Sequence, residues 1–244
     1  MRKIRLTLEY DGTAYGGWQV QPNADTVQQR VEDALREVIR EKVRVHGAGR
    51  TDAGVHALGQ VAHFETGSLL PAENIRDGAN THLPPDIVIL RAEDVPASFH
   101  ARYSARGKIY RYRVLLRPVR APLERHRAYR VSPPLDMEAM WTAARKLTGR
   151  HDLVSFAAAG CSIKDTIRTL SRLEISEAGD LIEFELEADG FLYKMARNIV
   201  GTLLEAGRGK LVAGDVARII ASGDRTLAGP TAPAQGLYLV RVIY

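Results

Sequence analysis

The sequence predicts an α+β protein built from two similar halves. The order strand, loop, helix, strand occurs twice, with helix starts at Thr26 and Asp136. The 244 residues are 45% hydrophobic and 26% charged, which suits one or two globular domains with a real core. We therefore expect domains over residues 1–105 and 106–244, each a sheet covered by helices. Two such halves would form a cleft, where ligand sites are common.

The first half begins with a strand, because residues 4–9 alternate between apolar and polar types. Glycines and a proline then predict a loop over residues 10–25. A helix follows from Thr26, which has the spacing of a capping box with Gln29. The remaining elements expected here are strands at 43–46, 60–65 and 87–92, and a helix beginning near Pro71.

The second half repeats this order, starting with a strand at residues 108–116. A connection rich in proline and arginine leads to a helix over 136–147. Further along we expect a short apolar strand at 153–156, a hairpin of 166–176 and 181–187, helices at 191–206 and near Asp215, and a closing strand at 238–243. The boundary between the halves falls near Ala105, where the charge composition changes.

Basic residues are concentrated between Arg102 and Arg130. This basic stripe holds ten basic residues and one acidic residue, Glu124, although the whole chain carries a formal charge of only +5. Four tyrosines are interleaved with the positive charge. Phosphate contacts and base stacking require this composition, so the stripe favours nucleic-acid binding. A solvated strand and loop would have the same composition, so that interpretation stays open.

Several kinds of site are disfavoured. The single cysteine, Cys161, allows no internal disulfide and no cysteine cluster. The seven histidines show no pair at metal-ligand spacing near an acid, and His56 and His63 are interpreted as ordinary hydrogen-bonded side chains. No bound metal is expected. The N-terminus lacks the apolar block of a signal peptide and no run could span a bilayer, so we expect a cytoplasmic protein.

The segment HGAGRTDAGVHALGQ, residues 46–60, surrounds Asp52 with glycine and alanine. It is not a nucleotide-binding loop, because Asp52 replaces the third glycine of a dinucleotide fingerprint and the lysine of a phosphate-binding loop is missing. A carboxylate here either caps a turn or acts as a nucleophile at an activated carbon. Hydrolysis of a glycosidic bond normally needs two carboxylates. One carboxylate suits a glycosidic bond that is broken and remade without water.

The run GAGRTDAGVHA closely resembles the active-site motif of the tRNA pseudouridine synthases that modify the anticodon stem-loop. The resemblance extends over nearly the whole chain through EYDGTAYGGWQVQP, GQVAHFET, FHARYSARGKIYRYR, MARNIVGTLLEAG and GLYLV. It implies two ferredoxin-like halves related by internal pseudo-symmetry, with a basic cleft between them. It also implies isomerisation of uridine to pseudouridine at tRNA nucleotides 38, 39 and 40, no cofactor, and a homodimer.

The resemblance carries over residue by residue. Asp52 matches the catalytic aspartate, Tyr110 the active-site tyrosine, and Arg197 the arginine that pairs with the aspartate. Arg50 matches a residue linked to displacing the target base, and Leu237 matches a residue of the base pocket. Tyr193 and Lys194 stand where a relative has a pair of histidines, so neither receives a role.

The basic stripe supplies the residues that we expect to contact the RNA backbone: Arg102, Arg106, Lys108 and Arg111. The alternative is a non-catalytic protein that binds tRNA or other RNA through residues 102–130. A weaker alternative is an RNA-cleaving nuclease, which would need a carboxylate cluster for a metal.

Overall fold

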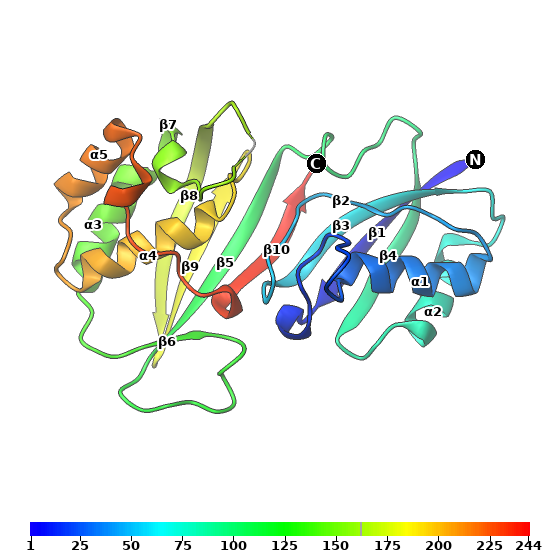
Figure 1. Cartoon of the computed structure of the whole chain (residues 1–244), viewed down its shortest axis with the longest axis horizontal. Helices are drawn as coiled ribbons and strands as arrows, with labels where there is room; N and C mark the ends of the chain where they lie inside the picture. The colour runs from blue at the N-terminus through cyan, green and yellow to red at the C-terminus, as the bar shows by residue number, and fades with distance from the viewer. Residues whose placement is uncertain (162) are drawn as a thin grey trace. The chain divides into compact units, whose positions relative to one another are not determined.

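The computed structural model describes residues 1–161 and 163–244 and confirms the α+β class (Figure 1). Its contacts divide the chain into two compact units. The first holds Met1–Arg106 together with Tyr238–Tyr244, and the second holds Gly107–Leu237. The expected division into 1–105 and 106–244 assigns the closing strand to the second half. In the structure this strand pairs with a strand of the first unit, with Tyr238 opposite His56.

The sheet of the first unit has the strand order β4-β1-β3-β10, and the short β2 pairs with β3. Strand β1 lies antiparallel to both β3 and β4, whereas β10 runs parallel to β3. Ile4, Leu6 and Leu8 of β1 are fully buried, as the alternating pattern predicts. The strands are β1 Arg2–Tyr10, β2 His46–Gly47, β3 His56–Thr66, β4 Ile87–Val95 and β10 Leu237–Ile243.

Two helices, α1 (Val27–Ile39) and α2 (Ala72–His82), cover this sheet (Figure 1). The Thr26 hydroxyl accepts a hydrogen bond from the Gln29 backbone N–H, which confirms the predicted start of α1. Pro71 is the N-cap of α2, because its ring fixes φ and it has no N–H to leave unpaired. A short 3-10 turn, Gly12–Ala14, interrupts the predicted loop.

The predicted strand at 43–46 is wrong except for its last residue. Val45 is buried, but its N–H donates to the Glu32 carboxylate at 2.9 Å, and its carbonyl accepts from the Gln28 side-chain amide at 3.0 Å. Because side chains of α1 satisfy these backbone groups, the segment needs no strand partner there.

The second unit has the strand order β5-β9-β8-β7, and the short β6 lies parallel to β5. The predicted hairpin is confirmed as β8 and β9, joined by a turn in which Gly179 has φ of +61°. The strands are β5 Gly107–Leu116, β6 Tyr129–Val131, β7 Gly149–Asp152, β8 Ile167–Ala178 and β9 Leu181–Ala188.

Three helices lie against one face of this second sheet (Figure 1): α3 Met137–Leu147, α4 Met195–Gly207 and α5 Ala213–Ser222. Helix α4 begins four residues later than predicted. Lys194 has φ of +58°, a left-handed conformation that cannot be part of a right-handed helix, so the helix starts only after it. The predicted strand at 153–156 is instead a 3-10 turn over Val154–Phe156. The Asp152 carboxylate accepts from the Val154 N–H at 3.1 Å and starts this turn. Two more 3-10 turns are Arg225–Leu227 and Ala234–Gly236.

Candidate active site

Asp52 lies in the loop that joins β2 to β3. Its own carbonyl accepts from the Val55 N–H at 3.1 Å, which closes a tight turn in which Gly54 has φ of +78°. A left-handed residue is needed at this point, and glycine adopts it without a steric penalty. The Asp52 side chain is half-buried and the Arg50 side chain is exposed. The turn thus holds a carboxylate partly exposed beside an accessible guanidinium on the same short loop.

A second glycine-rich segment packs against the Asp52 loop. The Trp18 N–H donates to the Thr51 carbonyl at 3.0 Å. Gly17 has φ of +103°, and a Cβ there would come within 2.6 Å of the same carbonyl oxygen. Gly47 faces the Trp18 ring with equally little space, since a Cβ would lie 2.6 Å from the indole nitrogen. The glycine-rich segment YDGTAYGGW can therefore lie close enough to the Asp52 loop for a backbone hydrogen bond to hold that loop in place.

A buried polar chain continues this support. Tyr10 and Thr51 share a hydroxyl–hydroxyl hydrogen bond of 2.9 Å. The Gln60 amide donates to the Gly49 carbonyl at 2.9 Å and to the Tyr10 hydroxyl at 3.4 Å. Burial raises the pKa of Tyr10 to about 12, so its hydroxyl keeps its proton and can serve as donor. These side chains immobilise the backbone on both sides of Arg50 and Asp52.

In the second unit, Arg197 lies on the first turn of α4 and is half-buried. Its Nε donates to the Ala232 carbonyl at 2.7 Å, and the Ala232 N–H donates back to the Arg197 carbonyl at 3.1 Å. One turn further along, Gly201 lies so close to the Pro230 carbonyl that a Cβ would overlap it. The helix and the segment at 229–232 therefore meet backbone to backbone, which fixes the direction of the guanidinium.

Buried Asn198 strengthens the same junction. Its amide donates to the Phe156 carbonyl at 2.7 Å, and its oxygen accepts from the Thr231 hydroxyl at 2.6 Å and from Arg225 at 3.0 Å. The MARNIVG motif thus joins α4 to the chain that leads toward Leu237.

Tyr110 and Tyr112 point to the same face of β5, but their surroundings differ. Tyr112 is fully buried, its hydroxyl donates to the Pro233 carbonyl at 2.7 Å, and Gly236 lies against its ring. Burial also raises the pKa of Tyr112 well above its usual value. Tyr110 is 7% exposed and meets the Phe191 ring edge to face at 4.7 Å between centroids. Leu237, at the start of β10, is also buried.

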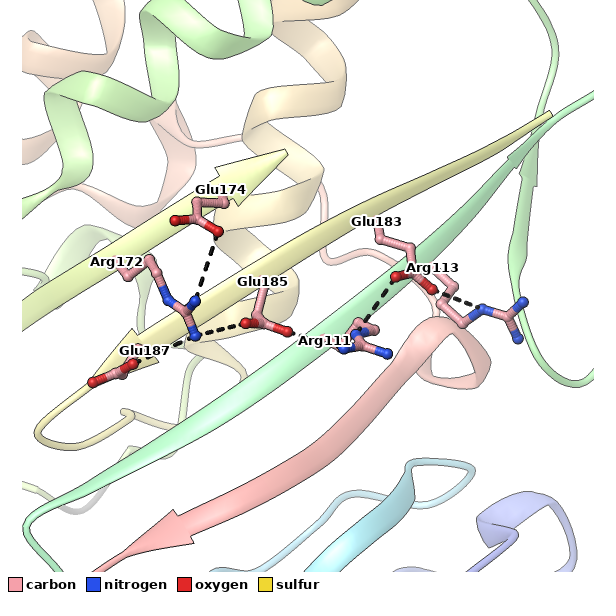
Figure 2. Close-up of polar contacts among 7 residues, drawn as sticks. All are labelled: Arg111, Arg113, Arg172, Glu174, Glu183, Glu185 and Glu187. Carbon is pink, nitrogen blue, oxygen red and sulfur yellow. Dashed lines mark hydrogen bonds and ion pairs between the residues drawn. The ribbon is translucent and has the colours of Figure 1, made fainter. Parts of the chain in front are cut away.

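The arginines of β5 form ion pairs across the sheet on the face away from the helices. Figure 2 shows three arginines and four glutamates that alternate over β5, β9 and β8. Arg111 lies 3.1 Å from Glu185 and 3.6 Å from Glu183, and Arg113 lies 3.4 Å from Glu183. Arg172 of β8 reaches Glu185 at 2.6 Å. We call this set the charge ladder: Arg111, Arg113, Arg172, Glu174, Glu183, Glu185 and Glu187.

The other expected backbone contacts lie elsewhere. Arg102 and Arg106 are exposed in the first unit, where the Arg106 N–H donates to the Ile243 carbonyl at 2.8 Å. Lys108 is half-buried on β5 in the second unit. Arg111 differs from these residues, because it belongs to the charge ladder and glutamates balance its charge.

Sequence reasoning missed the residues that position the candidate catalytic groups. Tyr10, Gln60 and Gly17 hold the Asp52 loop, and Asn198 and Gly201 hold Arg197. The glycines at 12–17 and at 47–54 could have indicated that these two segments pack closely against each other. The sequence shows nothing comparable for Asn198, because a buried asparagine in a helix cannot be told from an exposed one.

Two further features concern the described residues only. No group of three His, Cys, Asp or Glu side chains in residues 1–161 and 163–244 is arranged to hold a metal ion. Within the same ranges, none of the helices combines the length and hydropathy that a membrane span requires.

Comparison with known proteins gives the same family as the sequence motifs. The profile of the family described as tRNA pseudouridine synthase matches residues 7–104 and 143–244. The chain is 49% identical over 245 residues to a tRNA pseudouridine synthase A of Ruminiclostridium cellulolyticum. It is 50% identical over 244 residues to that of Thermoanaerobacter sp. and 48% identical to that of Acetivibrio thermocellus. All three alignments cover the whole of both chains. The chain belongs to the tRNA pseudouridine synthase family.

Proposed function

We propose that this protein converts uridine to pseudouridine in tRNA, at nucleotides 38, 39 and 40 of the anticodon stem-loop. The observation that carries the proposal is the full-length identity of 48–50% to relatives named tRNA pseudouridine synthase A, together with the fixed Asp52 loop. In this reaction the bond from ribose C1′ to uracil N1 breaks and a bond from C1′ to C5 forms. The C5 proton is released and N1 gains a proton, so no atoms are added and no oxidant is consumed.

Asp52 is the proposed catalytic nucleophile. A carboxylate can attack an activated carbon such as C1′ and leave again when the base returns. Arg197 is proposed to pair with this carboxylate, because an opposite charge nearby keeps a carboxyl group ionised. The hydrogen bond of Arg197 to the Ala232 carbonyl supports a fixed guanidinium that does not reorganise during the reaction.

Tyr110, Arg50 and Leu237 are proposed to handle the base. The target uridine must leave its stack in the stem, which costs a few kcal/mol. Arg50 is exposed on the catalytic loop, which suits a side chain that displaces the base. Tyr110 offers an aromatic face to the uracil and a hydroxyl for the C5 proton, and Leu237 offers an apolar pocket wall.

We further propose that the protein acts as a homodimer in the cytoplasm, and that Arg102, Arg106, Lys108 and Arg111 contact the RNA backbone. Exposed Arg102 and Arg106 support this role. The ion pairs of Arg111 with Glu183 and Glu185 mean that a phosphate would have to compete with carboxylates for its guanidinium.

The test is to map pseudouridine in a transcribed tRNA with uridine at positions 38, 39 and 40, after incubation with the purified protein. A water-soluble carbodiimide leaves an adduct on pseudouridine that stops reverse transcriptase. Stops at these positions alone are expected. Stops only elsewhere would contradict the proposed positions. A wild type that binds tRNA but produces no stops would favour a non-catalytic RNA-binding protein.

A further inference from the structure

The arginines that follow β5 lie on a loop with a defined construction. Strand β6 pairs with the end of β5, with Val114 opposite Tyr129 and Leu116 opposite Val131, so the two ends of the loop at 117–128 are held side by side. In Figure 1 this loop extends beyond the end of the sheet, next to the label of β6. A loop closed at its base over about 6–16 residues is a compact unit that often carries function.

Hydrogen bonds within the loop keep its shape. The Arg130 guanidinium donates to the carbonyls of Arg117 and Pro118, each at 3.1 Å. Two consecutive turns follow: the Glu124 N–H donates to the Ala121 carbonyl at 3.1 Å, and the Ala128 N–H donates to the Glu124 carbonyl at 3.0 Å. The Glu124 carboxylate lies 3.7 Å from Arg113 of the charge ladder. The one acidic side chain of the loop therefore has a basic partner at ion-pair distance, although its Oε2 makes no hydrogen bond to the described residues.

This loop surrounds an open hollow of about 950 Å³. Proline, alanine and valine side chains line much of it, together with Tyr129, and its charged lining residues are three arginines and one glutamate: Arg120, Arg125, Arg130 and Glu124. Arg120 is exposed and has no ion pair in the described part of the chain. Val119 and Leu123 are 59% and 89% exposed. Apolar and aromatic side chains, together with arginines that outnumber the single glutamate, suit a ligand that has a flat base and an anionic phosphate.

We propose that the loop at 117–128, with Tyr129 of β6, binds an unpaired nucleotide of the RNA substrate, at a site separate from the uridine that reacts. The nucleotide phosphate contacts Arg120 and its base stacks on Tyr129. Unpaired nucleotides are the parts of RNA whose bases can leave the helix and stack on aromatic and guanidinium groups. The proposal rests on the proposed function for the identity of the RNA. The charge ladder, by contrast, already balances its arginines with glutamates and is not part of this site.

The experiment measures binding of a fluorescently labelled, unmodified tRNA transcript to the full chain at several salt concentrations. Arg120→Gln should reduce the slope of log Kd against log salt by about 0.7, the value for one contact with a single-stranded phosphate. Tyr129→Leu removes the aromatic face together with the hydroxyl that hydrogen-bonds to Arg208, whereas Tyr129→Phe removes the hydroxyl alone and should bind with nearly the wild-type affinity. Tyr129→Leu should weaken binding roughly fivefold or more at every salt concentration without changing the slope.

Arg150→Gln is the matched control, because Arg150 is an exposed arginine of β7 in the same unit and outside the loop. It should bind tRNA with the wild-type slope. Thermal unfolding of each variant shows whether it is folded, and Arg120→Gln keeps the test decisive if Tyr129→Leu proves unstable, because the Arg120 side chain is exposed.

The proposal is overturned if folded Arg120→Gln binds tRNA with the wild-type salt slope, or if folded Tyr129→Leu binds with the wild-type affinity. A wild type that forms pseudouridine while Arg120→Gln binds normally would remove this site and leave the proposed function intact. Absence of pseudouridine formation by the wild type is a failure of the proposed function, and the salt slopes report on the loop independently of it.

Discussion

Tyr110 and Tyr112 show how two identical side chains on one strand face can have different surroundings. The Tyr112 hydroxyl donates to the Pro233 carbonyl and the Tyr112 ring packs against Gly236. This side chain therefore supports the chain that leads into β10. Tyr110 retains some exposure and meets the Phe191 ring edge to face. The sequence places both tyrosines on the same face, but it cannot show that the Tyr112 hydroxyl is committed to a backbone partner.

Replacing each tyrosine by phenylalanine separates their roles. Tyr112→Phe leaves a buried carbonyl without its donor, so the free energy of unfolding should fall by about 1–2 kcal/mol while the activity per folded molecule stays near that of the wild type. Tyr110→Phe should lose most activity, because its hydroxyl is proposed to take part in the reaction. Urea unfolding and single-turnover assays measure both. Equal effects of the two variants on activity would refute the proposed role of Tyr110.

At the scale of elements, the close approach of α4 to the segment at 229–232 is the feature that positions Arg197. It depends on Gly201, because any larger side chain would overlap the Pro230 carbonyl. The hydrogen bond from the Gly229 N–H to the Thr202 hydroxyl, at 2.9 Å, crosses the same junction. The helix therefore carries a glycine in its interior in spite of the cost to helix propensity.

Gly201→Ala and Gly214→Ala form a matched pair of helical substitutions. Gly201→Ala should lower the free energy of unfolding by about 1–3 kcal/mol through overpacking, and should reduce activity by displacing Arg197. A Cβ at Gly214 of α5 would meet no atom of the surrounding structure within 4 Å, so Gly214→Ala should be neutral or stabilise the protein by up to about 1 kcal/mol. Chemical denaturation of both variants is the measurement. Similar stability changes would contradict the account of the junction.

Local patterns in the sequence predicted most elements and missed those decided by side-chain partners. Alternation identified β1 and the hairpin of β8 and β9, and the cap at Thr26 identified α1. Val45 reads as part of a strand, yet Glu32 and Gln28 of α1 satisfy its backbone. The charge ladder was also invisible, because the pairing of Arg111 with Glu185 depends on the register between β5 and β9.

For the whole molecule, the distribution of charge matters more than the net value of +5. The basic stripe divides between arginines balanced by glutamates on the charge ladder and exposed arginines, such as Arg102 and Arg120, outside it. The candidate catalytic residues are similarly divided, with Asp52 in the first unit and Tyr110 and Arg197 in the second. These residues could be predicted from the resemblance of the sequence motifs. The contacts that hold them in place could be identified only from the structure.

Acid should destabilise the protein through His63. Burial, followed by the nearby charges of His100, His46 and Lys3, lowers the pKa of His63 to about 4, with Glu65 acting in the opposite direction. Its Nδ1 accepts a hydrogen bond from the Ala101 N–H at 3.1 Å, which protonation would break. The unfolded chain takes up this proton near pH 6.5. The stability is therefore complete above that pH and is lost as the pH falls toward 4.

Urea unfolding at pH 7 and pH 5 measures this effect in the wild type and in His63→Gln. Glutamine can still accept from the Ala101 N–H but does not titrate, so the variant should lose less stability between the two pH values. The same loss in both proteins would show that other groups cause the acid sensitivity.

The central claim is that Asp52 makes this protein an isomerase of tRNA uridine. Release of tritium from tRNA labelled at uracil C5 tests it most directly, because the product has the same mass as the substrate. We expect release by the wild type, and none by folded Asp52→Asn, which removes the charge with little change in volume and should still bind tRNA. Tritium release by Asp52→Asn at the wild-type rate, or none by a folded wild type that binds tRNA, would contradict the account.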